Sequence, residues 1–384
     1  MRFIHLSDLH IGKQLHHYSL LEEQRDVLQQ VVAYVKKEQP DALLIAGDIY
    51  DTAVPSAEAI AVFDEFLTGL DEVQKKLTIC IIAGNHDSAR RLDYASRILA
   101  KHAIHIVGMP PLKAEEGIRT VVVEDAYGEV AFYLLPFVKP GYLKKMFLEE
   151  NLTFSDAVGR LLAKERLDGT RRNVLVSHQF YAGGGMTPVT SESEVHTVGG
   201  IDNVEVEVLK PFDYAALGHI HRAQKIGEAK NYYCGTIFPY SVSEVDEEKF
   251  VTLVELQEKG KEPCIRKLPL ELPRKVRKLR GTMEALLAQA DGEVCHDYVS
   301  ITLTDEVEAS HPRERLEEYY DHILEIKIDN ARTRKLLELG EIEAENMAPY
   351  EAFCKFFFEM NGRELTEAED SLLKAVLQEG GDME

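Results

Sequence analysis

The sequence predicts a layered α/β fold over roughly its first 270 residues, because strand patterns and helix patterns alternate there. Several of the strand patterns are nearly continuous apolar runs, which is typical of strands that are covered on both faces. The expected strands are Arg2–Ser7, Asp41–Ala46, Leu77–Ala83, Ile104–Val107, Thr120–Val123, Val130–Leu135, Asn173–Ser177, Tyr214–Leu217 and Val251–Leu256. The expected helices between them are Leu20–Lys37, Ala57–Leu70, Ala89–Ala100 and Ser155–Arg166.

The first strand begins at the second residue, so the N-terminus has no apolar stretch of the 7–15 residues that a secretory signal needs. The longest apolar runs, Ala42–Ala46 and Leu77–Ala83, are those of buried strands and are far shorter than the ~18–20 residues of a membrane helix. The five cysteines are scattered and none forms C-x-x-C, which indicates reduced, buried thiols. We therefore expect a cytoplasmic protein.

A break in the pattern falls at residues 271–280, where five basic residues cluster beside Pro269 and Pro273. A smaller α+β unit follows, with a helix near Thr282–Ala290, a strand Tyr298–Thr304, a helix Pro312–Asp321 and a strand Leu324–Lys327. Two short helices, Pro349–Met360 and Thr366–Gln378, complete the chain. We expect a main domain at 1–270, a basic linker at 271–280, a small domain at 281–345 and a helical tail at 346–384.

The formal net charge of −22 argues against a nucleic-acid partner at first sight. Most of this acidity, however, lies in residues 281–384, and part of the remainder fits metal ligands, whose charge a bound cation would offset. The charge therefore does not exclude a nucleic-acid substrate for the main domain.

Five short polar motifs each follow an apolar strand directly. They are Asp8-Leu9-His10, Gly47-Asp48-Ile49-Tyr50-Asp51, Gly84-Asn85-His86-Asp87, Ser177-His178 and Gly218-His219-Ile220-His221. In an open α/β sheet, the carboxyl ends of the strands form the crevice where ligands bind. Clustered carboxylates and imidazoles are costly to bury unless a cation neutralises them. Carboxylate, amide and imidazole ligands without thiolate suit Mn²⁺, Fe²⁺ or Zn²⁺, so the motifs together predict a metal site.

In this order, the motifs resemble those of the calcineurin-like metallophosphoesterases. The segments Arg2–Lys13, Ala46–Thr52, Leu217–Ala223 and Tyr233–Thr236 are similar to the SbcD-type nuclease subunits of bacterial double-strand-break repair complexes. The resemblance implies a four-layer double β-sandwich flanked by helices. It also implies a small α+β capping domain and a C-terminal helical tail.

The resemblance also implies roles for individual residues. Asp8, His10 and His221 would hold one of two divalent ions, Asn85, His178 and His219 would hold the other, and Asp48 would bridge them. A shared carboxylate suits two cations about 3.5–4 Å apart, which would polarise the scissile phosphate and stabilise the leaving oxygen. His86 would be the proton donor or transition-state stabiliser, and Asp51 and Asp87 would support the ligands. Mn²⁺ is the metal that the resemblance implies.

Contacts with DNA and with other chains stay open at this point. His16, His17, Arg274, Lys275, Arg277 and Lys278 are candidates for DNA contacts, although a solvated linker explains the last four equally well. The helices Ala57–Leu70 and Ala89–Ala100 would either pack on the sheet or form a homodimer contact. In the tail, Phe353, Phe356, Phe357 and Met360 share one helical face, which fits either the chain's own core or a coiled-coil ATPase of the SbcC type.

The predicted function is metal-dependent hydrolysis of DNA phosphodiester bonds. The resemblance implies 3′-to-5′ exonuclease action on double-stranded ends and endonuclease action on single strands and hairpins. It further implies a role in DNA repair, replication and recombination, within a heterotetramer that contains two copies of this chain. No P-loop motif occurs, so ATP hydrolysis would belong to the partner. The alternatives are a phosphatase or cyclic-nucleotide phosphodiesterase of the same fold, and a scaffold with an inactive site.

Overall fold

The computed structural model describes residues 1–183, 185–194, 202–290, 294–307, 311–334 and 349–381. The chain divides into two compact units, one of Met1–Lys278 with His296–Val299 and the other of Leu279–Cys295 with Ser300–Glu384. The predicted boundary near residue 345 lies outside the described residues. No helix among the described residues is long and apolar enough to cross a membrane.

The first unit contains a six-stranded sheet in the order β16-β15-β1-β4-β5-β6. Its strands β1 (Arg2–Leu6), β4 (Ala42–Ala46), β5 (Thr78–Ile82) and β6 (Ile104–Val107) are parallel. Strands β15 (Phe250–Glu255) and β16 (Cys264–Pro269) run antiparallel to their neighbours. β4 and β5 are buried along their whole length, as their continuous apolar sequences predict.

A second six-stranded sheet of the same unit has the order β13-β14-β12-β9-β8-β7. It consists of β7 (Arg119–Asp125), β8 (Gly128–Leu135), β9 (Arg172–His178), β12 (Tyr214–Gly218), β13 (Gln224–Lys225) and β14 (Asn231–Tyr233). β8, β9, β12 and β14 are parallel, so their carboxyl ends meet at one edge.

The two sheets pack face to face around a buried core. Phe3 of β1, Phe132 of β8 and Tyr214 of β12 meet there edge to face, with ring centroids 5.7 Å and 5.5 Å from Phe3. The opposite face of the second sheet packs on α5 (Pro140–Phe147) and α6 (Phe154–Lys164), which contribute the buried Leu143 and Leu161.

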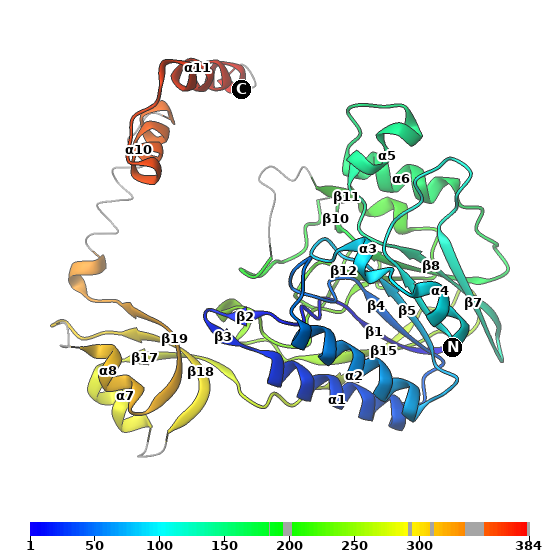
Figure 1. Ribbon diagram of the computed structural model, residues 1–384, viewed down its shortest axis with the longest axis horizontal. Coiled ribbons are helices and arrows are strands. Elements are labelled where there is room, and N and C mark those ends of the chain that lie inside the picture. The colour runs from blue at the N-terminus through cyan, green and yellow to red at the C-terminus, as the bar shows by residue number, and fades with distance from the viewer. Residues whose placement is uncertain (184, 195–201, 291–293, 308–310, 335–348, 382–384) are drawn as a thin grey trace. The chain divides into compact units, whose positions relative to one another are not determined.

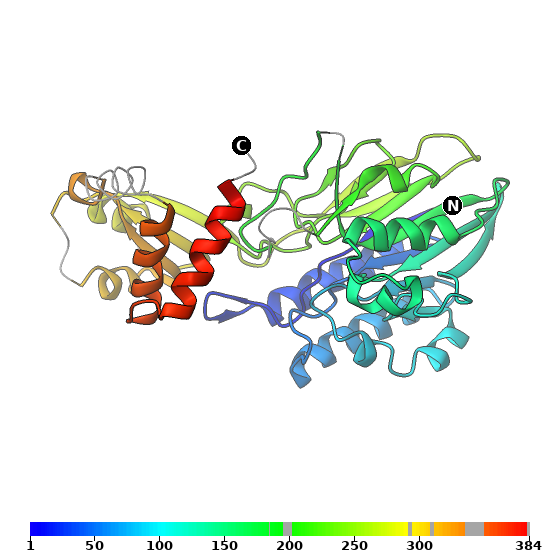
Figure 2. The ribbon, with the colours of Figure 1, turned by 90° about the horizontal axis from the view of Figure 1, so that it is seen from above.

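Figures 1 and 2 show α1 (Leu21–Glu38) and α2 (Ala57–Val73) side by side along the first sheet. Helices, two sheets and helices therefore form four layers, which confirms the expected architecture. Short elements complete this unit: β2 (Gln14–Leu15), β3 (Tyr18–Ser19), β10 (Phe180–Ala182), β11 (Asn203–Glu205), η1 (Ala100–His102), η2 (Val206–Leu209) and η3 (Val242–Glu244).

The segment 89–100 differs from the single helix that its sequence predicts. It forms two short helices, α3 (Ala89–Leu92) and α4 (Ser96–Leu99), separated by Ala95 in the left-handed conformation with φ 59°. A non-glycine residue at positive φ cannot continue an α-helix, so the chain turns there.

The C-terminal part of the chain holds a three-stranded sheet in the order β17-β18-β19, of which residues 276–278 and His296–Val299 belong to the first unit. Its elements are β17 (Val276–Gly281), α7 (Met283–Gln289), β18 (Cys295–Leu303), α8 (Pro312–Glu317) and β19 (Tyr320–Ile328). β17 occupies half of the segment expected to be a linker, and its apolar residues Val276 and Leu279 are buried. The tail forms α10 (Pro349–Asn361) and α11 (Glu367–Gly381).

Candidate metal centre

The seven predicted ligands lie at the carboxyl ends of parallel strands from both sheets. Asp8 and His10 follow β1, Asp48 follows β4 and Asn85 follows β5 in the first sheet. In the second sheet His178 ends β9, and His219 and His221 follow β12. The two edges meet, so that side chains far apart in sequence form one cluster of carboxylates, imidazoles and an amide.

Four of these residues adopt the left-handed backbone conformation, which side chains rarely take. The φ angles are 52° at Asp8, 43° at His10, 50° at Asp48 and 97° at His219. Such conformations are costly, and they concentrate at functional sites where the surrounding fold enforces them. The neighbouring Gly47 has φ 93°, and a Cβ atom there would collide with the ring of His178. The backbone is thus shaped to aim these side chains into the cluster.

Asp8, His10 and His221 form the first part of the cluster. One donor atom from each lies within 4.8 Å of the others, and all three residues are buried. The Nε2 atoms of His10 and His221 lie 3.2 Å apart. Two buried imidazole nitrogens facing a carboxylate make a donor set that suits a divalent cation.

Asn85, His178 and His219 form the second part. The Oδ1 atom of Asn85 lies 3.0 Å from His178 Nε2 and 2.9 Å from His219 Nδ1. The ring of Phe137 stacks on that of His219, with centroids 6.2 Å apart, which holds the imidazole in place. The Nδ1 atom of His178 lies 2.7 Å from the carbonyl oxygen of Ala46 and therefore carries a proton. Nε2 is then the nitrogen that can coordinate a metal.

Asp48 stands between the two parts. Its Oδ2 atom lies 3.3 Å from His178 Nε2 and 3.6 Å from His10 Nε2. Its Oδ1 atom accepts a hydrogen bond of 2.9 Å from the backbone N–H of His86. One carboxylate thus faces a histidine from each part, which is the arrangement that a shared ligand requires.

The electrostatics of the cluster favour a bound cation. Burial raises the pKa of Asp8 and lowers that of His221 well below its usual value, because the charged form of each side chain is unfavourable away from water. Burial also opposes ionisation of Asp48, but the adjacent His178 and His10 outweigh it and lower the pKa of its carboxyl. A divalent cation would replace these imidazolium charges and leave the nitrogens free to coordinate, so the residues fit a metal.

His86, Asp51 and Asp87 surround the cluster in different ways. The Nδ1 atom of His86 lies 2.8 Å from the carbonyl of Asp51, and its ring meets that of His10 at 87° with centroids 4.8 Å apart. The Asp51 carboxylate accepts from Lys13 at 2.9 Å and lies 3.3 Å from His10 Nδ1. The Asp51 carboxylate therefore orients the His10 imidazole through its Nδ1 atom.

Asp87 supports the ligand loops and not the ring of His86. Its carboxylate accepts backbone N–H hydrogen bonds from Gly84 at 2.9 Å, Tyr50 at 3.0 Å and Ile49 at 3.1 Å. These bonds join the loop after β4 to the loop after β5. Asp87 thereby fixes the spacing between Asp48 and Asn85.

A chain of hydrogen bonds behind His221 was not predicted from the sequence. Ser193 Oγ lies 2.7 Å from His221 Nδ1 and donates to Glu244 Oε1 at 2.7 Å. The fully buried Glu244 in turn accepts from Lys249 Nζ at 2.7 Å and Thr236 Oγ1 at 3.1 Å. Because the serine proton goes to the carboxylate, His221 must donate from Nδ1, which leaves Nε2 free to coordinate.

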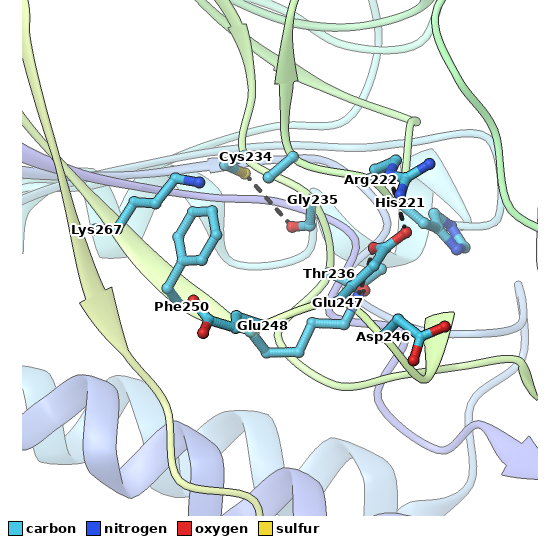
Figure 3. A pocket seen from close by; sticks show the side chains of 12 residues that line it. His221, Arg222, Cys234, Gly235, Thr236, Asp246, Glu247, Glu248, Phe250 and Lys267 are labelled. Atoms are coloured by element: carbon cyan, nitrogen blue, oxygen red, sulfur yellow. Dashed lines mark hydrogen bonds and ion pairs between the residues drawn. The ribbon is translucent and has the colours of Figure 1, made fainter. Parts of the chain in front are cut away.

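A cavity of about 250 Å³ adjoins this chain of hydrogen bonds. Figure 3 shows His221 and Arg222 on one side of it, with Glu247 and Lys267 among the other charged side chains in the wall. Within this wall, Arg222 pairs with Glu247 at 3.1 Å and Lys249 pairs with the same carboxylate at 3.5 Å.

The candidate DNA contacts lie in two places. His16 and His17 are exposed in the hairpin between β2 and β3. In the basic segment, Arg274 pairs with the buried Glu23, and Arg277 pairs with Asp297 at 2.6 Å. Lys275 and Lys278 are exposed. Two of the four basic residues therefore already have acidic partners, which the sequence alone did not indicate.

Comparison with known proteins gives matches over nearly the whole chain. Residues 1–223 match the calcineurin-like phosphoesterase family, and residues 272–361 match a family described as type 5 capsule protein repressor C-terminal domain. The chain is 27% identical to the D subunit of the nuclease SbcCD from Staphylococcus epidermidis, covering 98% of both chains. It is 28% identical to the protein of the same name from Staphylococcus saprophyticus, covering 99% of this chain and 100% of that protein.

Solved structures give more distant likenesses. One is a dimetal phosphatase from Danio rerio, 14% identical, with a TM-score of 0.40 over 71% of this chain and 99% of the other. Another is TT1561 of Thermus thermophilus, 10% identical, with a TM-score of 0.39 over 69% and 98%. The family match spans more than half of the chain and contains all seven clustered side chains, from Asp8 to His221. The chain belongs to the calcineurin-like phosphoesterase family.

Proposed function

We propose that this chain is the nuclease subunit of an SbcCD-type complex and hydrolyses DNA phosphodiester bonds with divalent metal ions. The observation that carries this proposal is that Asp48 lies between two groups of ligand-type side chains, close to His10 of one and His178 of the other. The two staphylococcal relatives named as nuclease subunits support DNA as the substrate, because they align along 98–99% of this chain, well past the phosphoesterase match.

Asp8, His10 and His221 would hold one ion, Asn85, His178 and His219 the other, and Asp48 both. Mn²⁺ is the proposed metal, because the resemblance to SbcD-type nucleases implies it and the ligand set without thiolate is compatible with it. Such ions, when bound, supply Lewis-acid activation of the phosphate and of water. The chain itself orients these ligands: Ala46 and Ser193 fix the tautomers of His178 and His221.

His86 would be the proton-transfer residue of the proposed reaction. Its Nδ1 atom donates to the main-chain carbonyl of Asp51, which leaves Nε2 free to exchange a proton with the reacting phosphate or leaving group. His86 is partly exposed, in contrast to the buried His10 beside it, so substrate can reach its ring. We propose 3′-to-5′ exonuclease action on duplex ends and endonuclease action on hairpins and single strands.

Partner chains would bind at two other places. On α10 and α11, Phe353, Phe356, Leu372 and Val376 are 42%, 59%, 66% and 57% exposed, which supports docking of an SbcC-type ATPase on the tail. The side chain of Met360, which was expected on the same face, lies outside the described residues.

A homodimer contact is proposed for α2, α3 and α4. Ile60, Tyr94 and Ile98 on or beside these helices are 49%, 83% and 63% exposed. Tyr94→Glu should shift the mass measured by light scattering from dimer to monomer.

The proposed role of the tail has its own test. Deleting residues 347–384 should abolish co-purification with the ATPase but keep metal-dependent hydrolysis.

The test of the main proposal compares substrates and metals. The purified chain, with Mn²⁺ or EDTA, is incubated with end-labelled duplex and hairpin DNA, alone and with the ATPase and ATP. Parallel reactions use p-nitrophenyl phosphate and cyclic nucleotides. We expect Mn²⁺-dependent DNA cleavage that Asp48→Ala abolishes. Turnover of the small phosphates alone, with DNA intact in every reaction, would instead assign a small-substrate phosphoesterase.

A further inference from the structure

A second cavity, of about 480 Å³, is lined in part by Asn85 of the metal cluster. Gly84, Asn85 and Asp87, from the loop that supplies a ligand, form one wall of it. We propose that this cavity is a subsite for the nucleoside attached to the scissile phosphate. The inference rests on the proposed nuclease function and adds a binding site for the sugar and base to it.

The remaining walls have the character of a base-binding surface. Met109, Leu112 and Phe137 supply apolar surface, and Tyr142, which also lines the cavity, is 40% exposed. A base has two flat apolar faces and stacks on exposed aromatic rings without regard to sequence. The volume exceeds what one base needs, so the sugar would fit as well.

The charges beside the cavity fit a phosphodiester backbone. Lys139 and Arg90 line it, and within the described residues neither forms an ion pair or side-chain hydrogen bond. Arg274 and Arg277 of the basic segment, in contrast, are paired with Glu23 and Asp297. Lys139 and Arg90 are therefore available beside the metal centre to meet a negatively charged strand that enters at this cavity.

Two contacts of Phe137 fix the position of this cavity relative to the metal ligands. The backbone N–H of Phe137 donates to the carbonyl of Ala83 at 2.9 Å, one residue before the loop that carries Asn85. The Phe137 ring stacks on the His219 imidazole. A base in this cavity would thus be placed at a fixed distance from the phosphate, which is how a binding subsite aids a phosphoryl-transfer site.

The first measurement is binding by isothermal titration calorimetry to the full, Mn²⁺-loaded chain. Thymidine 5′-monophosphate and inorganic phosphate are the two probes. We expect the nucleotide to bind more tightly than phosphate, and Tyr142→Ala to reduce that preference by about tenfold, the scale of one lost stacking contact. Equal affinities for the two probes in the unmodified chain would overturn the proposal.

Matched controls lie outside the cavity. Tyr127→Ala removes a tyrosine that is 52% exposed in the β7–β8 turn, at the opposite end of the sheet from the metal centre. Lys145→Ala removes an exposed lysine from the same helix as Tyr142. A similar loss of preference in these controls would also overturn the proposal.

A kinetic measurement separates this inference from the nuclease proposal. The ratio of kcat/KM for the p-nitrophenyl ester of thymidine 5′-monophosphate to that for bis(p-nitrophenyl) phosphate reports the nucleoside subsite alone. We expect Tyr142→Ala to lower this ratio about tenfold. If the ratio falls but no DNA is cleaved with or without the ATPase, the subsite stands and the nuclease proposal fails. If DNA is cleaved and the ratio is unchanged, the subsite is refuted.

Discussion

Ser193 Oγ lies 2.7 Å from Nδ1 of His221 and connects this imidazole to the buried carboxylate of Glu244. Ser193→Ala should therefore weaken Mn²⁺ binding at one of the two proposed metal sites by about 10–100-fold, the usual effect of losing a hydrogen bond to a metal-ligating histidine. Titration calorimetry and the electron paramagnetic resonance spectrum of bound Mn²⁺ would measure this directly. Ser193→Thr, which keeps the hydroxyl, should restore binding.

Ser243→Ala is the matched control for that experiment. Its hydroxyl contacts Ser241 Oγ at 2.7 Å and the backbone of Glu192, but not His221. Wild-type Mn²⁺ affinity in Ser193→Ala would show that the serine does not position the ligand.

His86→Gln should lower kcat on DNA by at least about 10²-fold, because general acid–base residues typically contribute a factor of that size or more. Metal binding should persist, because the hydrogen bond that Asp48 receives comes from the backbone N–H of residue 86 and survives the substitution. Rapid-quench kinetics and Mn²⁺ titration on the same preparation would separate the two effects. His102→Gln, at an exposed position in η1, serves as control. Unchanged kcat in His86→Gln would rule out the proposed role.

Asp87→Ala should destabilise the first unit by about 3 kcal/mol, since three backbone N–H groups would lose a charged acceptor. The Mn²⁺ affinity should fall as well, because the loops that carry Asp48 and Asn85 would no longer be tied together. Urea unfolding in EDTA measures the first effect without the second. The exposed Asp93→Ala provides the comparison, and equal unfolding midpoints for the two variants would contradict the assignment.

His5 should make the fold sensitive to mild acid. Burial lowers the pKa of this imidazole to about 3, and its Nδ1 atom lies 3.0 Å from the hydroxyl of Tyr214. Above about pH 6.5 both the folded and the unfolded chain keep His5 neutral, so it has no effect. As the pH falls below that value, only the unfolded chain takes up the proton, and the free energy of unfolding decreases by about 1.4 kcal/mol per pH unit until about pH 3 is approached.

His5→Gln keeps a hydrogen-bonding group but cannot titrate. The loss of stability between about pH 7 and pH 5 should accordingly be about 2 kcal/mol smaller in this variant than in the wild type, both in EDTA. Urea unfolding at the two pH values measures the difference. Parallel pH dependences in the two proteins would show that His5 is not the group responsible.

The fold class and the clustering of seven ligands could be predicted because each ligand closely follows an apolar strand. Local sequence contains that information, as Asp8 after Arg2–Leu6 illustrates. The roles of the ligands in binding metal stay predictions. The hydrogen bonds from Ser193 to Glu244 and from Tyr50 to Asp87 could not be predicted, since they join segments whose proximity depends on the complete fold.

Two further differences have equally specific causes. The predicted helix at 89–100 is broken at Ala95, and an alanine gives no local signal of a positive φ because it is a strong helix former. The charges of Arg274 and Arg277 are evident in the basic segment, but their acidic partners, Glu23 and Asp297, lie elsewhere in the sequence. Surface charge could be counted from the sequence, whereas its availability to a ligand could not.

The division of the ligands between the two sheets has a mechanical consequence. Asp8, His10, Asp48 and Asn85 come from the first sheet, and His178, His219 and His221 come from the second. Each proposed ion would therefore tie both sheets together, as a cross-link does, at an interface otherwise held by apolar packing. Sliding of one sheet over the other would require ligand bonds to break, so chelation should loosen the sandwich first at the edge where the strands β4 and β9 end, and amide hydrogen exchange there would report metal occupancy.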